Sequence, residues 1–217
     1  MNLANSLVAQ RIAGELLRIK AVKLQPNDPF TWASGWKSPI YCDNRKTMKY
    51  PDLRKEIAKA FAQGVREKFP NCQVIHAVAT GAIAIGVMVA EELNVPFGYV
   101  RPTSKGHGLG NRIEGEEAEG NKTVVIEDLI STGGSSLSAV KALRSEGADV
   151  LGMFAIFTYG FEAAEEKFAE ASCDLYTLSH YSMLLNAAVE GAYVNEEQLE
   201  VLAEFCKSPS TWKPANS

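Results

Sequence analysis

TVVIEDLISTGGSS, at residues 123–136, places a short apolar run before two acids and a loop of hydroxyls and glycines. The apolar run predicts a strand over residues 123–127, buried in a parallel sheet where both of its faces are covered. The strand ends in the acids Glu127 and Asp128. After the loop, a helix is expected near residues 134–146, closed by Gly147. This order of strand, loop and helix is typical of an α/β fold.

The loop at residues 131–135 lies where a phosphate group is readily bound. Ligands of open α/β sheets bind beyond the carboxyl ends of the strands, and a helix N-terminus there offers unpaired N–H groups and a partial positive charge. Glu127 and Asp128 would repel phosphate directly, but carboxylates accept hydrogen bonds from sugar hydroxyls and help to hold a hard cation. The segment therefore predicts a sugar-phosphate site. An ordinary strand–loop–helix junction with capping serines is the weaker interpretation, because two acids follow a buried strand.

On both sides of this segment, strands alternate with helices, which implies a mostly parallel sheet covered on both faces. Further strands are expected near residues 73–79, 96–100, 149–157 and 174–178, and helices near 3–19, 51–69, 82–92 and 161–171, with one or two more at the C-terminus. Residues 25–46 are rich in turn formers, and the tail 208–217 is expected to fray. We expect one α/β domain over residues 1–217, in which residues 1–50 and the C-terminal segment form a small hood over the sheet.

Composition and charge exclude several classes of protein. The net charge of −4 gives no general attraction for nucleic acid or for an anionic membrane. The longest apolar stretch, residues 77–90, is shorter than the roughly 20 residues that span a bilayer, and the N-terminus does not resemble a signal peptide. The four cysteines are far apart, which favours reduced thiols in a cytoplasmic protein over disulfides or a zinc site.

A second informative segment, YVRPTSKGHGLGN at residues 99–111, combines three basic side chains with three glycines. Arg101, Lys105 and His107 alternate with glycines in a pattern that describes a flexible, positively charged flap. Such a flap can close over a diphosphate and exclude water. A solvent-exposed hairpin with incidental charges explains the composition equally well.

Residues 127–135, EDLISTGGS, resemble the phosphoribosyl diphosphate signature of the type I phosphoribosyltransferases. The resemblance implies that family's fold, a central, mostly parallel sheet flanked by helices, with a hood. It also implies that the acids hold the ribose hydroxyls and that the loop surrounds the 5-phosphate. The residues that it assigns to this substrate are Glu127, Asp128, Leu129, Ile130, Ser131, Thr132, Gly133, Gly134 and Ser135.

The basic segment has the spacing RxxxKxHG and resembles the catalytic loop of the orotate phosphoribosyltransferases, which reaches across a dimer to the diphosphate. By this resemblance Arg101, Lys105 and His107 are catalytic and also contact the diphosphate. Family members often have a second basic residue where this chain has Pro102. The turn at Thr80 and Gly81 is similar to the family's diphosphate-binding turn, although some relatives carry lysine at the position of Gly81.

The stretch FTWASGWKSPIYCDNR, residues 30–45, resembles the N-terminal motif FxxxSGxxSPxYxDxR of the same branch. Orotate is a flat ring with a carboxylate, and an arginine fork pairs with carboxylates bidentately. We therefore expect Arg45 and Lys37 near that carboxylate, with Tyr41 and Ser131 also at the base. An equally compatible alternative is that Arg45 braces the hood through an ion pair with Asp43 or another acid.

The resemblance implies transfer of phosphoribosyl from 5-phosphoribosyl 1-diphosphate to orotate in a homodimer, with Mg²⁺ carried by the substrate and no direct protein ligand for the metal. Two alternatives share the fold. A purine phosphoribosyltransferase would not be expected to carry the SGxxSPxYxDxR segment that this chain has. A non-catalytic, nucleotide-sensing regulator should carry a basic face or an added DNA-binding helix pair.

Overall fold

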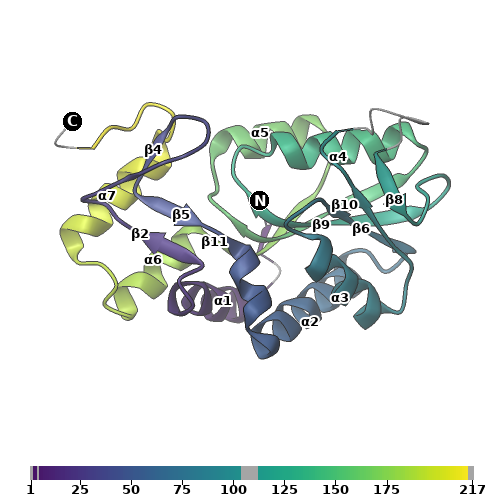
Figure 1. Cartoon of the computed structure of the whole chain (residues 1–217), viewed down its shortest axis with the longest axis horizontal. Coiled ribbons are helices and arrows are strands. Elements are labelled where there is room, and N and C mark those ends of the chain that lie inside the picture. The colour runs from purple at the N-terminus through teal and green to yellow at the C-terminus, as the bar shows by residue number, and fades with distance from the viewer. Residues whose placement is uncertain (1, 4, 104–111, 215–217) are drawn as a thin grey trace.

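The computed structural model describes residues 2–3, 5–103 and 112–214 (Figure 1). Within these ranges the main sheet has seven strands in the order β1-β11-β10-β9-β6-β7-β8. The strands are β1 (Asn2–Leu3), β6 (Val74–Val78), β7 (Phe97–Val100), β8 (Ile113–Gly115), β9 (Lys122–Ile130), β10 (Asp149–Thr158) and β11 (Leu175–His180). All neighbours pair in parallel except β7 and β8 at one edge. The prediction of a mostly parallel sheet is therefore confirmed.

Helices cover both faces of the sheet, as the alternating pattern predicts. In Figure 1, α4 (Gly134–Ser145) and α5 (Glu162–Glu170) lie on one side, and α2 (Pro51–Lys68) and α3 (Ile83–Leu93) on the other. The two apolar cores follow the alternation of side chains along a strand. Val124 and Ile126 of β9 belong to the core with α2 and α3, whereas Val125 belongs to the core with α4 and α5.

A smaller group of elements packs at one end of the sheet, and its members β2, β4, β5, α6 and α7 are labelled at the left of Figure 1. It comprises β2 (Val22–Leu24), β3 (Phe30–Thr31), β4 (Lys37–Ser38), β5 (Ile40–Cys42), the 3-10 helix η1 (Asn44–Lys49), α6 (Tyr181–Glu190) and α7 (Glu196–Lys207). Aromatic contacts join its two ends: the ring of Trp32 lies 5.1 Å from Tyr159 and 5.9 Å from Phe205. The segments before residue 50 and after β11 are thus in contact.

The extents of three segments differ from those expected from the sequence. The first helix, α1 (Ser6–Arg18), begins later than residue 3 because the Asn5 side chain caps its first N–H groups, and Leu3 instead belongs to the edge strand β1. The strand through the acids continues to Ile130, because it pairs with β10 as far as the pair of Ile130 with Thr158. The tail does not fray throughout, since Trp212 is buried and its ring packs edge-on against Phe205.

The turn-rich segment before residue 46 contains the short strands β3 to β5, which were not expected. The C-terminus has two helices, α6 and α7, within the described residues. No helix in those same ranges is both long enough and apolar enough to cross a membrane.

Candidate active site

A cleft of about 340 Å³ opens at the carboxyl ends of β6 and β9, beside η1. Seven of the residues selected from the sequence lie together in its lining: Arg45, Thr80, Gly81, Glu127, Asp128, Leu129 and Ser135. The remaining lining residues are Cys42, Asp43, Val78 and Ala79. Three segments that are distant in the sequence therefore meet at the sheet edge where ligands of α/β folds bind.

Glu127 is almost fully buried in the lining of this cleft, and both of its carboxylate oxygens accept hydrogen bonds. Oε1 accepts from the backbone N–H of Asp128 at 2.9 Å, and Oε2 accepts from the hydroxyl of Ser136 in α4 at 2.8 Å. Burial raises the pKa of Glu127 well above its usual value, and the neighbouring Asp128 raises it further. The first acid is thus braced between its own strand and the helix that follows.

The carboxylate of Asp128 lies against Gly81. A Cβ atom placed on Gly81 would come within 2.5 Å of Asp128 Oδ2, so the carboxylate occupies the space that a side chain at position 81 would need. This contact gives a physical reason for glycine at position 81. Burial raises the pKa of Asp128, and the positive charge of Arg45 partly opposes that shift.

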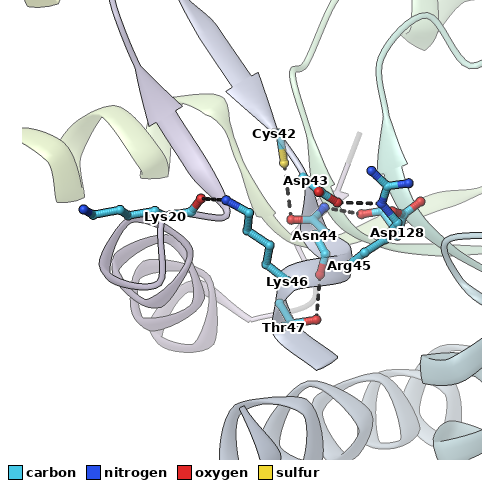
Figure 2. Close-up of polar contacts among 8 residues, drawn as sticks. All are labelled: Lys20, Cys42, Asp43, Asn44, Arg45, Lys46, Thr47 and Asp128. Carbon is cyan, nitrogen blue, oxygen red and sulfur yellow. Dashed lines mark hydrogen bonds and ion pairs between the residues drawn. The ribbon is translucent and has the colours of Figure 1, made fainter. Parts of the chain in front are cut away.

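Arg45 forms an ion pair with Asp43, with Nε 2.6 Å from Oδ1 (Figure 2). The hydrogen bond from Arg45 lowers the pKa of Asp43, more than burial raises it. The Arg45 side chain is nevertheless 64% exposed at the edge of the cleft. The bracing contact considered from the sequence is therefore present, and the role of Arg45 toward orotate stays a prediction.

Tyr41 and Lys37 lie on the short strands. The Tyr41 ring is partly exposed and tilts against Phe30 at 5.6 Å, while Lys37 Nζ donates to Thr31 Oγ1 at 2.8 Å. Neither is among the described residues that line the cleft.

The loop after β9 turns into α4 at Gly133, whose φ of +75° lies in the left-handed region that favours glycine. Lys167 of α5 donates to the carbonyl of Thr132 at 3.2 Å. The helix has no side-chain cap in the described structure, so its first N–H groups remain available to an anion. The side chain of Ile130, in contrast, is fully buried in the core, and its carbonyl accepts from Tyr159.

The basic segment begins at Arg101, which pairs with Glu114 of β8 at 3.5 Å. Lys105 and His107 lie outside the described residues, so the expectations for them remain predictions. His76 and His180 are engaged elsewhere: His76 is buried between Thr123 and Glu116, and His180 caps α6.

Three carboxylates line the cleft, and Asp43 among them is paired with Arg45. Both oxygens of Glu127 accept hydrogen bonds, while the carboxylate of Asp128 lines the cleft and is the type of ligand that a hard cation prefers. In the part of the chain that the structure describes, no group of three or more His, Cys, Asp or Glu side chains could hold a metal ion. The carboxylate of Asp128 is thus the group in the cleft that would hold a divalent cation.

Asn44 had no role assigned from the sequence, although it stands within the DNR of the N-terminal motif. Its side chain is buried and donates to the carbonyl of Asp128 (Figure 2). No local pattern marks this contact, because the two residues are 84 positions apart.

The chain is similar to known proteins over nearly its whole length. The model of the phosphoribosyl transferase domain matches residues 48–181. An orotate phosphoribosyltransferase of Phocaeicola vulgatus is 57% identical over 93% of this chain and 95% of its own length. Relatives of the same name from Porphyromonas gingivalis and Lactococcus lactis are 53% and 52% identical, over 93% and 95% of this chain and 96% and 99% of their own lengths.

Solved structures show the same similarity in fold. The orotate phosphoribosyltransferase of Aeropyrum pernix superposes with a TM-score of 0.72 at 26% identity, over 85% of this chain and 99% of its own. The UMP synthase of Leishmania donovani gives a TM-score of 0.77 at 25% identity, over 94% of this chain and 42% of its own. The sheet, its flanking helices and the cleft thus have the type I phosphoribosyltransferase fold, and the chain belongs to the orotate phosphoribosyltransferases of the phosphoribosyltransferase family.

Proposed function

We infer that the chain transfers phosphoribosyl from 5-phosphoribosyl 1-diphosphate to orotate, giving orotidine 5′-phosphate and diphosphate in the pathway to UMP. The enzyme is thus a glycosyltransferase. The observation that carries this function is identity above 50% to orotate phosphoribosyltransferases across almost the full chain. The cleft between β6, β9 and η1 supports it, because carboxylates and a helix N-terminus lie within reach of one sugar phosphate.

The reaction displaces diphosphate from the anomeric carbon by a ring nitrogen of orotate. Positive charge grows on the ribose and negative charge on the leaving group, so stabilisation of the diphosphate lowers the barrier most. We assign the ribose hydroxyls to Glu127 and Asp128 and the 5-phosphate to residues 131–135. The backbone around Thr80 and Gly81, together with the basic segment that starts at Arg101, is assigned to the diphosphate.

Mg²⁺ is proposed to enter with the sugar diphosphate rather than on a protein site of its own. When bound, it neutralises charge on the diphosphate. Asp128 is the side chain in the cleft that would hold it, because its oxygens face the space beside Gly81.

A homodimer is proposed because α3 presents an apolar face beside the cleft. Along this helix Ala84 is exposed, Val87 is 39% exposed, and Ile83 and Met88 are half-buried. The helix begins at Ile83, two residues after Gly81, and we propose that the basic segment of a second copy on this face reaches the diphosphate turn. We further propose a single cytoplasmic domain in which residues 1–50 and the C-terminal segment form the hood.

The test is an absorbance assay of base consumption with 5-phosphoribosyl 1-diphosphate and Mg²⁺. Orotate, uracil and hypoxanthine are compared at equal concentration. Of these three bases, we expect only orotate to be consumed. Turnover of hypoxanthine would favour the purine alternative, and binding of the sugar diphosphate without turnover of any base would favour the regulator.

A further inference from the structure

Asn44 links η1 to the strand that carries the acids. Its side-chain Nδ2 donates to the backbone carbonyl of Asp128 at 2.5 Å, and its Oδ1 accepts from the thiol of Cys42 at 3.3 Å (Figure 2). The backbone carbonyl of Asn44 accepts from the Thr47 hydroxyl at 2.7 Å. The residue is 1% exposed, so these contacts are made away from water.

The Asp128 carbonyl needs a hydrogen-bond donor, because the pairing of β9 with β6 ends before this residue. On the β6 side, the register ends at the pair of Ala77 with Ile126. On the β10 side, Glu127 pairs with Ala155 and Leu129 with Phe157, and the N–H of Asp128 donates to the Glu127 carboxylate. Both backbone groups of Asp128 are therefore bonded to side chains, and loss of the Asn44 amide would leave a carbonyl without this donor in a largely buried place.

The orientation of the Asn44 amide follows from its two partners. A carbonyl only accepts, so the NH₂ group must face Asp128. The Cys42 thiol can donate to the remaining oxygen, and its burial raises its pKa, so it keeps its proton. The side chain is thus held at both ends in one rotamer.

We propose that Asn44 is a positioning residue, which holds the Asp128 peptide group so that the carboxylate stays against Gly81 in the cleft. Because Asn44 lies between Asp43 and Arg45, the same contact fixes η1 relative to the sugar site. The inference rests on the proposed function, in that its readout is use of the sugar diphosphate. The competing view is that Asn44 only stabilises the fold.

Asn44→Ala and Ser179→Ala form a matched pair for the test. The Ser179 hydroxyl also is buried, and it donates to the carbonyl of Ala9 at 2.9 Å, which joins α1 to β11 away from the cleft. Each variant removes one buried side-chain donor to a backbone carbonyl, and Asn44→Ala also removes the acceptor of the Cys42 thiol. Melting temperatures and steady-state constants for both substrates are measured well below the melting range, with the Kd of the sugar diphosphate from calorimetry.

Both variants are expected to melt at lower temperature than wild type. Only Asn44→Ala is expected to lose about tenfold in kcat/KM for 5-phosphoribosyl 1-diphosphate, with a matching rise in Kd, because an unsatisfied buried group displaces the acid. If Asn44→Ala does not fold, Asn44→Leu replaces it, since leucine keeps the branched outline of the side chain and lacks the donor.

Kinetic constants and Kd equal to those of Ser179→Ala would overturn the positioning role and leave Asn44 as a structural residue. Failure of the wild type to consume orotate would instead refute the proposed function, so the two failures can be distinguished.

Discussion

Glu127 and Asp128 are adjacent in the chain, yet their carboxylates have different surroundings. Glu127 is held by Ser136 and by the N–H of Asp128, whereas Asp128 lies in the cleft against Gly81. Burial raises the pKa of both groups. Both acids therefore line the cleft, and Glu127 is the more tightly held of the two.

The buried Glu127 should make stability depend on pH. Its folded pKa is raised above the usual 4.5, so the folded state binds the proton more tightly. That stabilisation is complete below the unfolded pKa and is lost as pH rises through the folded pKa. The melting temperature of wild type relative to Glu127→Gln should therefore fall as pH rises from about 4 to 8.

Each unit of pKa difference between the folded and unfolded states changes the free energy of unfolding by about 1.4 kcal/mol. Each kcal/mol in turn shifts the melting temperature by about 2–4 °C for a protein of this size. Calorimetric scans at several pH values check this, with the exposed Glu166→Gln as control; parallel wild-type and Glu127→Gln curves would contradict it.

Gly81→Ala should impair use of the sugar diphosphate, because the added methyl would meet the Asp128 carboxylate at about 2.5 Å. We expect about tenfold or greater loss in kcat/KM, the range that corresponds to 1.4 kcal/mol or more. Gly14→Ala in α1 is the control, since no atom beyond the neighbouring backbone of the same helix lies within 4 Å of its added Cβ. Unchanged kinetics in Gly81→Ala would show that Asp128 is not needed where it lies.

Among the elements, β9 shapes the cleft most, because it is longer than its neighbour β6. The chain leaves β6 at Val78, while β9 continues to Ile130 along β10. This difference in length exposes the end of β9 to the cleft and leaves room for η1. The basic segment that follows β7 starts at the same edge of the sheet, with Arg101 paired to Glu114.

Lys105→Ala is predicted to lower kcat on the order of 100-fold, the loss typical when one donor to developing negative charge is removed. The reason is that its ammonium group is proposed to stabilise the leaving diphosphate. Lys59→Ala, on an exposed site of α2, is the control. Steady-state kinetics of orotate consumption measure the effect, and near-normal turnover in Lys105→Ala would remove this segment from catalysis.

At the scale of the whole molecule, the apolar face of α3 is proposed to pack against a second copy. Val87→Asp would bury a charge at that interface, which is costly without a partner. We expect a monomer by light scattering, and about 100-fold lower activity if the basic segment acts across subunits. Val189→Asp, at a 48% exposed site on α6, should leave the dimer intact. A Val87→Asp protein that stays dimeric would refute this interface.

The sequence by itself determined the alternation of strands and helices, the parallel sheet and the acids before a glycine loop. Those features are encoded locally, in apolar periodicity and in residues suited to one turn or one helix end. Its predictions were wrong at the start of α1 and the end of β9, because capping by Asn5 and pairing with β10 decide those limits. Only the tertiary structure decided that Gly81 faces Asp128 and that Asn44 bonds to the Asp128 carbonyl. Contacts between such distant segments depend on strand order and on how the N-terminal segment packs over the sheet, which no short pattern encodes.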